Sequence, residues 1–327
     1  MKNHKKQWRF CLFFLLFLYL LLFPEPARLG ACDGLLLWYR SVLPVLFPFM
    51  LLSAAALRTG AMDALPAVFQ KFIRNIFKCS RNGCFAVIIG FFCGFPMGAK
   101  ITADLLAQKK INDQEAKHLL GFVNNVSPVF LTSFLAAQQL ERPGLSICFL
   151  CSTLGAALLY GAWTAPKSIL PSDKADTSRE TDAKNNSMYT ASADASDRFV
   201  WIDEVINDSV YSMVKLGVCI MVFSMIGSGI FYFWKNGGIP SLVLRSCIEV
   251  TGGIQLICSS ALTLPQKYTA LSALCAFGGL SALIQTIAVA KLSPQLVKYY
   301  IKSRVIITLL AVLLSCFILF FFRGLFL

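Results

Sequence analysis

Two glycines, a proline and a lysine interrupt an apolar stretch of this sequence, at Gly94, Pro96, Gly98 and Lys100. Glycine and proline break helices, and a lysine in hydrocarbon costs roughly 2.5–3.5 kcal/mol on insertion scales. Broken backbone at membrane depth is tolerated only beside protein or a water-filled cavity. We therefore predict a re-entrant hairpin over residues 84–108. The helix restarting after its tip would offer free N–H groups and, with Lys100, an anion site.

A second polar interruption lies in the next apolar segment, residues 116–137, where Asn124, Asn125 and Ser127 precede a proline. Two interpretations compete. The amides could bond a neighbouring helix across a simple kink. Alternatively, the segment is a discontinuous helix that lines a binding site. We favour the second, because this interruption follows closely on the first.

Two acids lie within apolar sequence, Asp104 and Glu249. An intramembrane acid is a candidate for ion or proton coupling. The structural alternatives are an ion pair of Asp104 with Lys100, and a solvated Glu249 or one paired with Arg245, each four residues away. Both interpretations stay open at this level.

Composition sets the class of protein. The chain has 327 residues, of which 57% are hydrophobic and 14% charged, and its mean hydropathy is +0.66. This indicates an all-α polytopic membrane protein. The net charge of +13 is typical of basic cytoplasmic loops, since no basic, aromatic-rich soluble domain is left to bind nucleic acid. We expect no metal, no cofactor and no enzymatic activity, because no nucleophile–base pair, ligand cluster or nucleotide-binding loop is visible.

Hydropathy and charge divide the chain into four parts. A cytoplasmic tail and first transmembrane helix occupy residues 1–34, with a cleaved signal peptide as the alternative. A first membrane repeat follows (35–165), then a disordered cytoplasmic linker (166–203) and a second repeat (204–327). Besides the two interruptions, the expected elements are spans at 35–57, 144–163, 205–233 and 303–322, a basic surface helix at 63–82, and a second hairpin at 268–290.

The two repeats are weakly similar in sequence. Residues 92–98 align with 277–283, and residues 110–117 align with 291–298. The second hairpin would then place Gly279, Ser281 and Gln285 at its tip. Counting spans gives it the opposite orientation, as in inverted-repeat transporters. It also puts Lys291, Lys298, Lys302 and Arg304 outside, against the positive-inside rule.

The run CGFPMGAK, the helix start after Lys110 and the NNVSP interruption resemble the YlbJ/SpoVV-like sporulation integral membrane proteins, which carry a Gate (nucleoside-recognition) domain. The resemblance implies a membrane protein of endospore formers, acting in the mother cell or outer forespore membrane and linked to movement of dipicolinic acid. Gate domains also occur in nucleoside transporters with paired hairpins. The tip here carries no carboxylate or amide, which departs from the polar hairpins of those transporters.

The sequence thus predicts a multi-pass transporter in a bacterial cell membrane, with its N-terminus in the cytoplasm. Its site would hold a small anionic solute between two hairpin tips, with neutral hydrogen bonds from Asn124, Asn125, Ser127, Ser281 and Gln285. The expected partners are the lipid bilayer, the solute and, as an option, further copies in a homo-oligomer. The alternatives are a non-transporting scaffold of the sporulation membrane and a nucleoside-type transporter.

Overall fold

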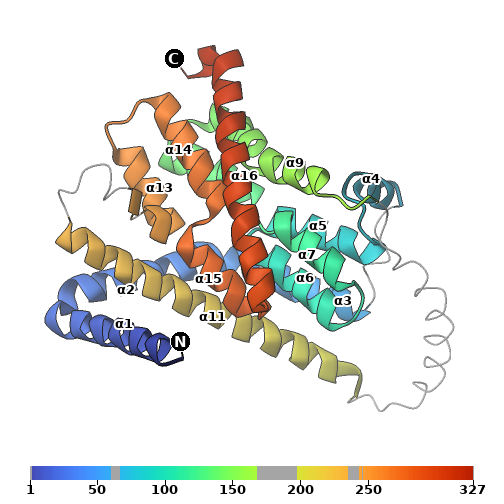
Figure 1. Cartoon of the computed structure of the whole chain (residues 1–327), viewed down its shortest axis with the longest axis horizontal. Coiled ribbons are helices and arrows are strands. Elements are labelled where there is room, and N and C mark those ends of the chain that lie inside the picture. The colour runs from blue at the N-terminus through green and yellow to red at the C-terminus, as the bar shows by residue number, and fades with distance from the viewer. Residues whose placement is uncertain (1, 60–66, 168–196, 235–242, 245, 327) are drawn as a thin grey trace.

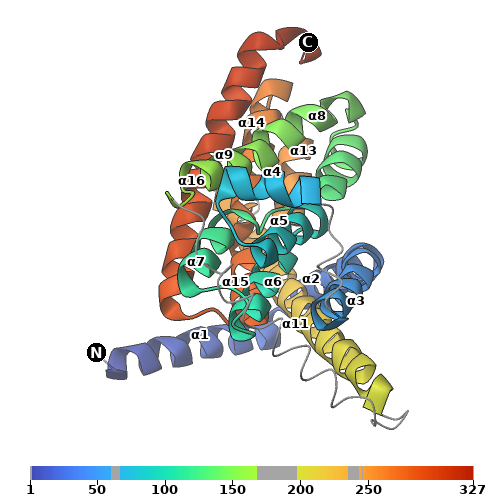
Figure 2. The same cartoon turned by 90° about the vertical axis from the view of Figure 1, so that its right-hand side faces the viewer.

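The computed structural model describes all residues except 1, 60–66, 168–196, 235–242, 245 and 327, and the regular elements of this part are all helices. They are arranged as shown in Figures 1 and 2. In chain order they are α1 (Lys2–Leu22), α2 (Pro24–Leu37), η1 (Trp38–Val42), α3 (Leu43–Thr59), α4 (Ala67–Phe77), α5 (Arg81–Cys93), α6 (Met97–Ala107), α7 (Asp113–Phe122), η3 (Phe130–Gln139), η4 (Pro143–Leu145), α8 (Ser146–Phe149), η5 (Leu150–Leu154), α9 (Gly155–Trp163), α11 (Asp197–Phe233), α13 (Val250–Ser259), α14 (Leu264–Phe277), α15 (Gly279–Ala290), α16 (Pro294–Phe321) and η6 (Arg323–Leu325).

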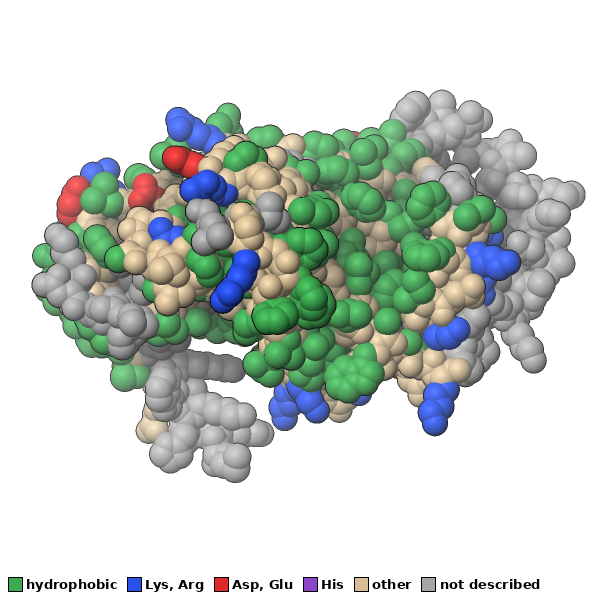
Figure 3. All heavy atoms as spheres, turned by 90° about the horizontal axis from the view of Figure 1, so that it is seen from above, with side chains coloured by type: hydrophobic (Ala, Val, Ile, Leu, Met, Phe, Trp, Pro, Cys, Tyr) green, Lys and Arg blue, Asp and Glu red, His purple; other side chains and the backbone are tan. Residues whose placement is uncertain are grey.

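Long apolar helices make this an all-α polytopic membrane protein. Four segments of the described part are long and apolar enough to span a bilayer: Pro143–Trp163, Trp201–Phe233, Leu264–Ala290 and Pro294–Phe321. The number rises to six if each of two bent helix pairs is one span. Large apolar side chains cover much of the face seen in Figure 3, with Lys and Arg mainly near its margins. Such a surface is stable only against lipid.

The first apolar segments differ from the expected pair of spans. The part of α1 from Phe13 to Leu22 meets the segment Pro24–Arg40 at a bend of 106°. The second helix begins at Pro24, whose fixed φ and missing N–H suit the first turn. From there α2, η1 and α3 follow without interruption, so the predicted boundary between residues 34 and 35 falls inside α2. Pro44 and Pro48 lie in α3, directly after the π-helical turn η1.

A small-residue motif ties this N-terminal arm to the second half of the chain. Gly30 and Gly34 are four residues apart on α2 and both face α11. A Cβ on Gly30 would lie 2.8 Å from the Met225 Cα, and one on Gly34 would lie 2.8 Å from the Met221 Cα. Small residues at this spacing let two helix backbones approach closely in a membrane.

The first predicted hairpin is present. After α5, Gly94 (φ +84°) and a cis Phe95–Pro96 peptide form a tight turn, and α6 returns alongside α5. In Figures 1 and 2, α5, α6 and α7 lie together in one layer. The surface helix expected before it corresponds to α4, which meets α5 at 91° and exposes Phe69 and Phe72; residues 63–66 of that prediction lie outside the described part.

The second predicted hairpin is instead a broken span. α14 ends at Phe277 with Gly278 as its C-cap residue (φ +86°, ψ −7°), and α15 starts at the residue after Gly278. The two helices follow each other end to end in Figure 1, and together they form one apolar segment of 27 residues, Leu264–Ala290. Two consecutive glycines with positive φ, Gly278 (+86°) and Gly279 (+74°), interrupt the hydrogen-bond ladder without reversing the chain, because only Gly278 separates the two helices.

This difference changes the relation between the repeats. Because α14 and α15 cross the molecule completely, Lys291 lies near Asp104, at the same end as the α6–α7 loop. Lys117 on α7 stacks on the Tyr299 ring of α16 at 4.9 Å. The two basic loops therefore share one end, and the conflict with the positive-inside rule disappears. The matched helices α7 and α16 also run in the same direction here, whereas an inverted repeat requires opposite directions.

Local structure agrees with the sequence alignment at the start of these two helices. Asn112 caps α7 by accepting from the Glu115 N–H at 2.8 Å. The aligned Ser293 caps α16 by accepting from the Leu296 N–H at 3.4 Å. The predicted linker (166–203) is only partly described: residues 197–203 already belong to α11, and residues 168–196 lie outside the described part.

Candidate functional site

Three interruptions of helical structure meet at one place. A Cβ on Gly94, at the α5–α6 turn, would lie 2.8 Å from the backbone nitrogen of Ser127 in the α7–η3 interruption. A Cβ on Gly278, at the α14–α15 break, would lie 2.7 Å from the ring of Phe95. The two glycine breaks and the NNVSP segment, which are far apart in sequence, are thus in contact. Pro96 lies in the same turn, as the N-cap residue of α6.

A cavity of about 360 Å³ opens beside this contact, and we call it the tip cavity. Its size is within the usual range for small-molecule sites. Buried Ser281 and Gln285 of α15 line it together with half-buried Ser127. Its other lining residues are Leu37, Arg40, Val42, Leu46, Cys93, Gly94, Phe95, Val126, Val129, Phe130, Ser133, Phe134, Gln138, Leu216, Ile220, Glu249, Val250, Thr251, Gly278 and Ala282.

The predicted coupling acid Glu249 lies on the tip cavity wall. It is the N-cap residue of α13, and its carboxylate accepts from the N–H groups of Thr251 (2.9 Å) and Gly252 (2.6 Å). The free N–H groups of a helix start stabilise a negative charge. The carboxylate is therefore held in a fixed position at the cavity. Arg245, the other partner considered for it, lies outside the described residues.

A cation that sequence reasoning missed completes the charge pattern. Arg40, in η1, lines the tip cavity and is exposed at its edge. Its guanidinium could bind a carboxylate through two parallel hydrogen bonds. The signal was present in the sequence, because an arginine between Tyr39 and Ser41 interrupts an apolar run, and such a residue is costly unless it faces a polar environment. Together with Glu249, it gives the cavity one positive and one negative side chain among the described lining residues.

Lys100 does not line the tip cavity. Its Nζ lies 3.1 Å from the Asp104 Oδ2, so the structure contains the predicted four-residue ion pair. Both residues face a different cavity of about 480 Å³, which we call the charged cavity. The N–H groups at the start of α6 are also engaged: Met97 N donates to Gly94 O (2.9 Å) and Ala99 N donates to the Asn124 Oδ1 (3.3 Å). The anion site expected from Lys100 and these groups is therefore not formed at the tip.

Asn124 and Asn125 are completely enclosed in the protein and do not line the tip cavity. Asn124 Nδ2 donates to Thr286 Oγ1 (3.0 Å) and Tyr300 Oη (2.7 Å). Because the Asn124 Oδ1 also accepts from the Ala99 N–H of α6, this one amide links α6, α15 and α16. Asn125 Nδ2 donates to Phe122 O at 2.6 Å. These contacts agree with the alternative in which the amides bond neighbouring helices, while Ser127 agrees with the discontinuous helix that lines a site.

A buried arginine on α16 completes this network. Arg304 has no solvent exposure, and its Nη1 donates to Asn124 O (2.7 Å) and Asn125 Oδ1 (3.0 Å). Its Nη2 donates to Gly121 O (3.0 Å), near the end of α7. Carbonyl groups that a broken helix leaves unpaired attract a cation at its C-terminus. Arg304 thus stabilises the interruption itself. The span count had instead predicted that Arg304 lies outside, together with Lys302.

Comparison with known proteins places the chain near one curated protein. It is 31% identical over 124 residues to the Sporulation integral membrane protein YlbJ of Bacillus subtilis (strain 168). The match covers 38% of this chain and 30% of that protein, so it spans less than a third of the relative's length. No family model matches the chain, and no solved structure matches it. The similarity supports the resemblance drawn from the sequence motifs.

Proposed function

We propose that this chain is a membrane transporter that carries a small anionic solute, with dipicolinic acid as the first candidate, in a sporulating cell. The observation that carries the proposal is the tip cavity, where three interrupted segments meet. Interrupted helices that converge on a cavity are the usual construction of a solute site in secondary transporters. The sporulation context rests on the similarity to YlbJ, whose name states that role.

The tip cavity can hold an anion at Arg40, because the carboxylate of Glu249, its other charged side chain among the described lining residues, is already bonded to two backbone N–H groups. Arg40 supplies the cation. Gln285 and Ser281, joined by a 2.6 Å hydrogen bond, present an amide and a hydroxyl at the buried side. Glu249 is already bonded to two backbone N–H groups, and we assign it a role in coupling to a cation or proton. Catalysis is no part of the proposal.

Binding by the purified protein tests this assignment. Isothermal titration with dipicolinate, its uncharged diamide and a nucleoside panel should show binding of the dicarboxylate alone. Arg40→Ala should weaken it about 10- to 100-fold, because a hydrogen bond to a charged group contributes about 1.5–3 kcal/mol. Arg28→Ala is the matched control: Arg28 lies on the preceding helix α2, pairs with Glu25 and does not line the cavity.

Uptake into proteoliposomes then separates transport from binding. Dipicolinate should accumulate inside vesicles that contain the native chain and not inside vesicles with Arg40→Ala. A scaffold protein would move no solute from the panel. Equal binding by native and Arg40→Ala protein would remove Arg40 from the site, and binding of nucleosides in place of dicarboxylates would reverse the choice of substrate class.

A further inference from the structure

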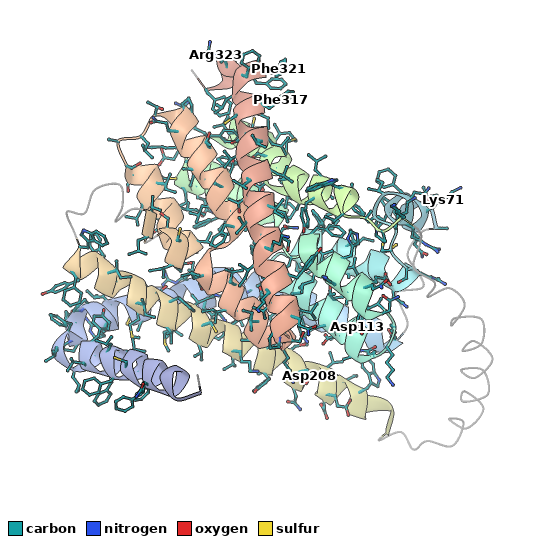
Figure 4. The ribbon with its side chains drawn as sticks, in the orientation of Figure 1. Lys71, Asp113, Asp208, Phe317, Phe321 and Arg323 are labelled. Carbon is teal, nitrogen blue, oxygen red and sulfur yellow. The ribbon has the colours of Figure 1, made fainter. Side chains whose placement is uncertain are left out.

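The charged cavity lies between α6, α7, α11 and α15, at the end of the molecule that holds the two basic loops. Its charged lining residues are three lysines and three aspartates: Lys100, Lys215, Lys291, Asp104, Asp113 and Asp208. Figure 4 shows Asp113 and Asp208 at the same lower end, away from Phe317 and Phe321 at the far end of α16. Because the charges balance, the lining selects neither anions nor cations and suits water.

Two helices, α11 and α15, and the α5–α6 hairpin line both cavities, and they do so in a consistent order. Along α15, Gln285 faces the tip cavity and Val289 the charged cavity. In the hairpin, Phe95 faces the tip cavity, and Lys100 on α6 faces the charged cavity. Helix α11 runs the other way: it reaches the charged cavity up to Lys215 and the tip cavity from Leu216.

The separation between the cavities is short. Four residues of helix, from Gln285 to Val289, correspond to about 6 Å at 1.5 Å per residue. On α11 two adjacent residues line different cavities: Lys215 lines the charged cavity and Leu216 lines the tip cavity. The wall between the cavities is therefore about one helical turn thick. It holds Leu216, with 2% exposure, and Thr286, with none.

Hydrogen bonds fasten this wall in the present conformation. Thr286 Oγ1 accepts from Asn124 Nδ2, whose amide oxygen accepts from the Ala99 N–H of α6. The same amide nitrogen donates to Tyr300 on α16. A single side chain thereby holds α6 and α15 together at the level of the wall.

We propose that the tip cavity and the charged cavity are successive chambers of one permeation path, closed between them by a one-turn wall at Leu216, Thr286 and Val289. The charged cavity is then a hydrated vestibule through which the solute enters or leaves on the side of the basic loops. This inference deepens the proposed transport function and rests on it. Thiol labelling tests the permeation path and needs no known solute. The permeation path and the proposed transport function can therefore fail independently of each other.

Accessibility from the two membrane faces tests the path. Thr251→Cys reports on the tip cavity and Ala103→Cys on the charged cavity; both positions are half-buried lining residues. A membrane-impermeant maleimide is added to right-side-out or inverted vesicles of the full chain, and labelling is quantified by peptide mass spectrometry, which distinguishes these sites from the native cysteines. Each cysteine should react about tenfold faster from one face than the other, and the preferred faces should be opposite, because reaction follows exposure.

Thinning the wall should join the chambers. Adding Leu216→Ala to the Thr251→Cys chain should raise its labelling from the vestibule face to within about threefold of the other face. Val289→Ala is the second variant, should Leu216→Ala reduce the yield of folded protein. Leu309→Ala is the matched control, because Leu309 is 60% exposed on α16, lines neither cavity and should leave the asymmetry intact. Labelling of both cysteines from the same face, no labelling at Thr251→Cys, or unchanged asymmetry in both wall variants would overturn the proposal.

Discussion

The two ends of the α7–η3 interruption differ in what surrounds them. Asn124 and Asn125 are closed into a network with Arg304, in which their amides meet protein groups. Ser127, two residues further along, is half-buried, accepts from the Phe130 N–H (3.2 Å) and lines the tip cavity. Polar residues in one short segment therefore serve two purposes: the first pair fixes the broken backbone, and the later residue faces the space that this break creates.

Two arginines, Arg304 and Arg40, show the same contrast between a buried network and an open cavity. Arg304 is fully buried and satisfies carbonyl oxygens, whereas Arg40 is exposed at the tip cavity. A buried polar group that loses its partner costs far more than an exposed one. Mutations on the network side should therefore lower stability, and mutations on the cavity side should lower binding. Four variants with decreasing expected effects test this division.

Arg304→Leu should lower the free energy of unfolding by about 3 kcal/mol, because buried acceptors left without donors cost about 1–3 kcal/mol each and loss of the buried charge offsets part of this. Denaturant unfolding of the protein in detergent micelles measures the change. Lys302→Leu, which removes an exposed cation two residues earlier on the same helix, should stay within about 0.5 kcal/mol of the native chain. Equal losses in the two variants would end the distinction between a structural and a surface cation.

Gly94→Ala and Gly278→Ala compare the turn of the hairpin with the break in the span. Gly94 has φ +84° and ψ −172°, a region essentially restricted to glycine, so alanine should cost about 2–3 kcal/mol. Gly278 has φ +86° and ψ −7°, close to the left-handed helical region, where alanine should cost about 1–2 kcal/mol. The expected order is read from the same unfolding measurement. A larger loss at Gly278 would mean that its contact with the Phe95 ring, rather than backbone conformation, decides the cost.

Lys100→Ala should have the smallest effect, a change in stability of about 0.5 kcal/mol or less. The Lys100 side chain is 13% exposed and that of its partner Asp104 is 36% exposed, so the carboxylate left behind is still open to solvent, and such ion pairs at helical spacing contribute little. Dipicolinate affinity should also change less than in Arg40→Ala, because Lys100 lines the charged cavity and not the tip cavity. A loss of affinity equal to that of Arg40→Ala would restore the anion site that the sequence suggested at Lys100.

Local features were predictable because they depend on neighbouring residues. The helix cap at Asn112, the turn at Gly94–Pro96, the interruption after Phe122 and the apolar segments all follow from residue type and short-range spacing. The direction of the chain after Gly278 was not predictable in this way. A pair of glycines permits both a reversal and a continuation, and packing against distant helices selects one.

The sequence by itself determined that this chain lies in a membrane and where its helices are interrupted, because hydropathy, glycine and proline act over a few residues. Only the tertiary structure decided which interruptions meet, which lysine or arginine faces a cavity and which pairs with carbonyl groups. The contact between Arg304 and Asn125 joins residues 179 positions apart. No local pattern encodes such a contact, since it exists only once α7 and α16 are packed together.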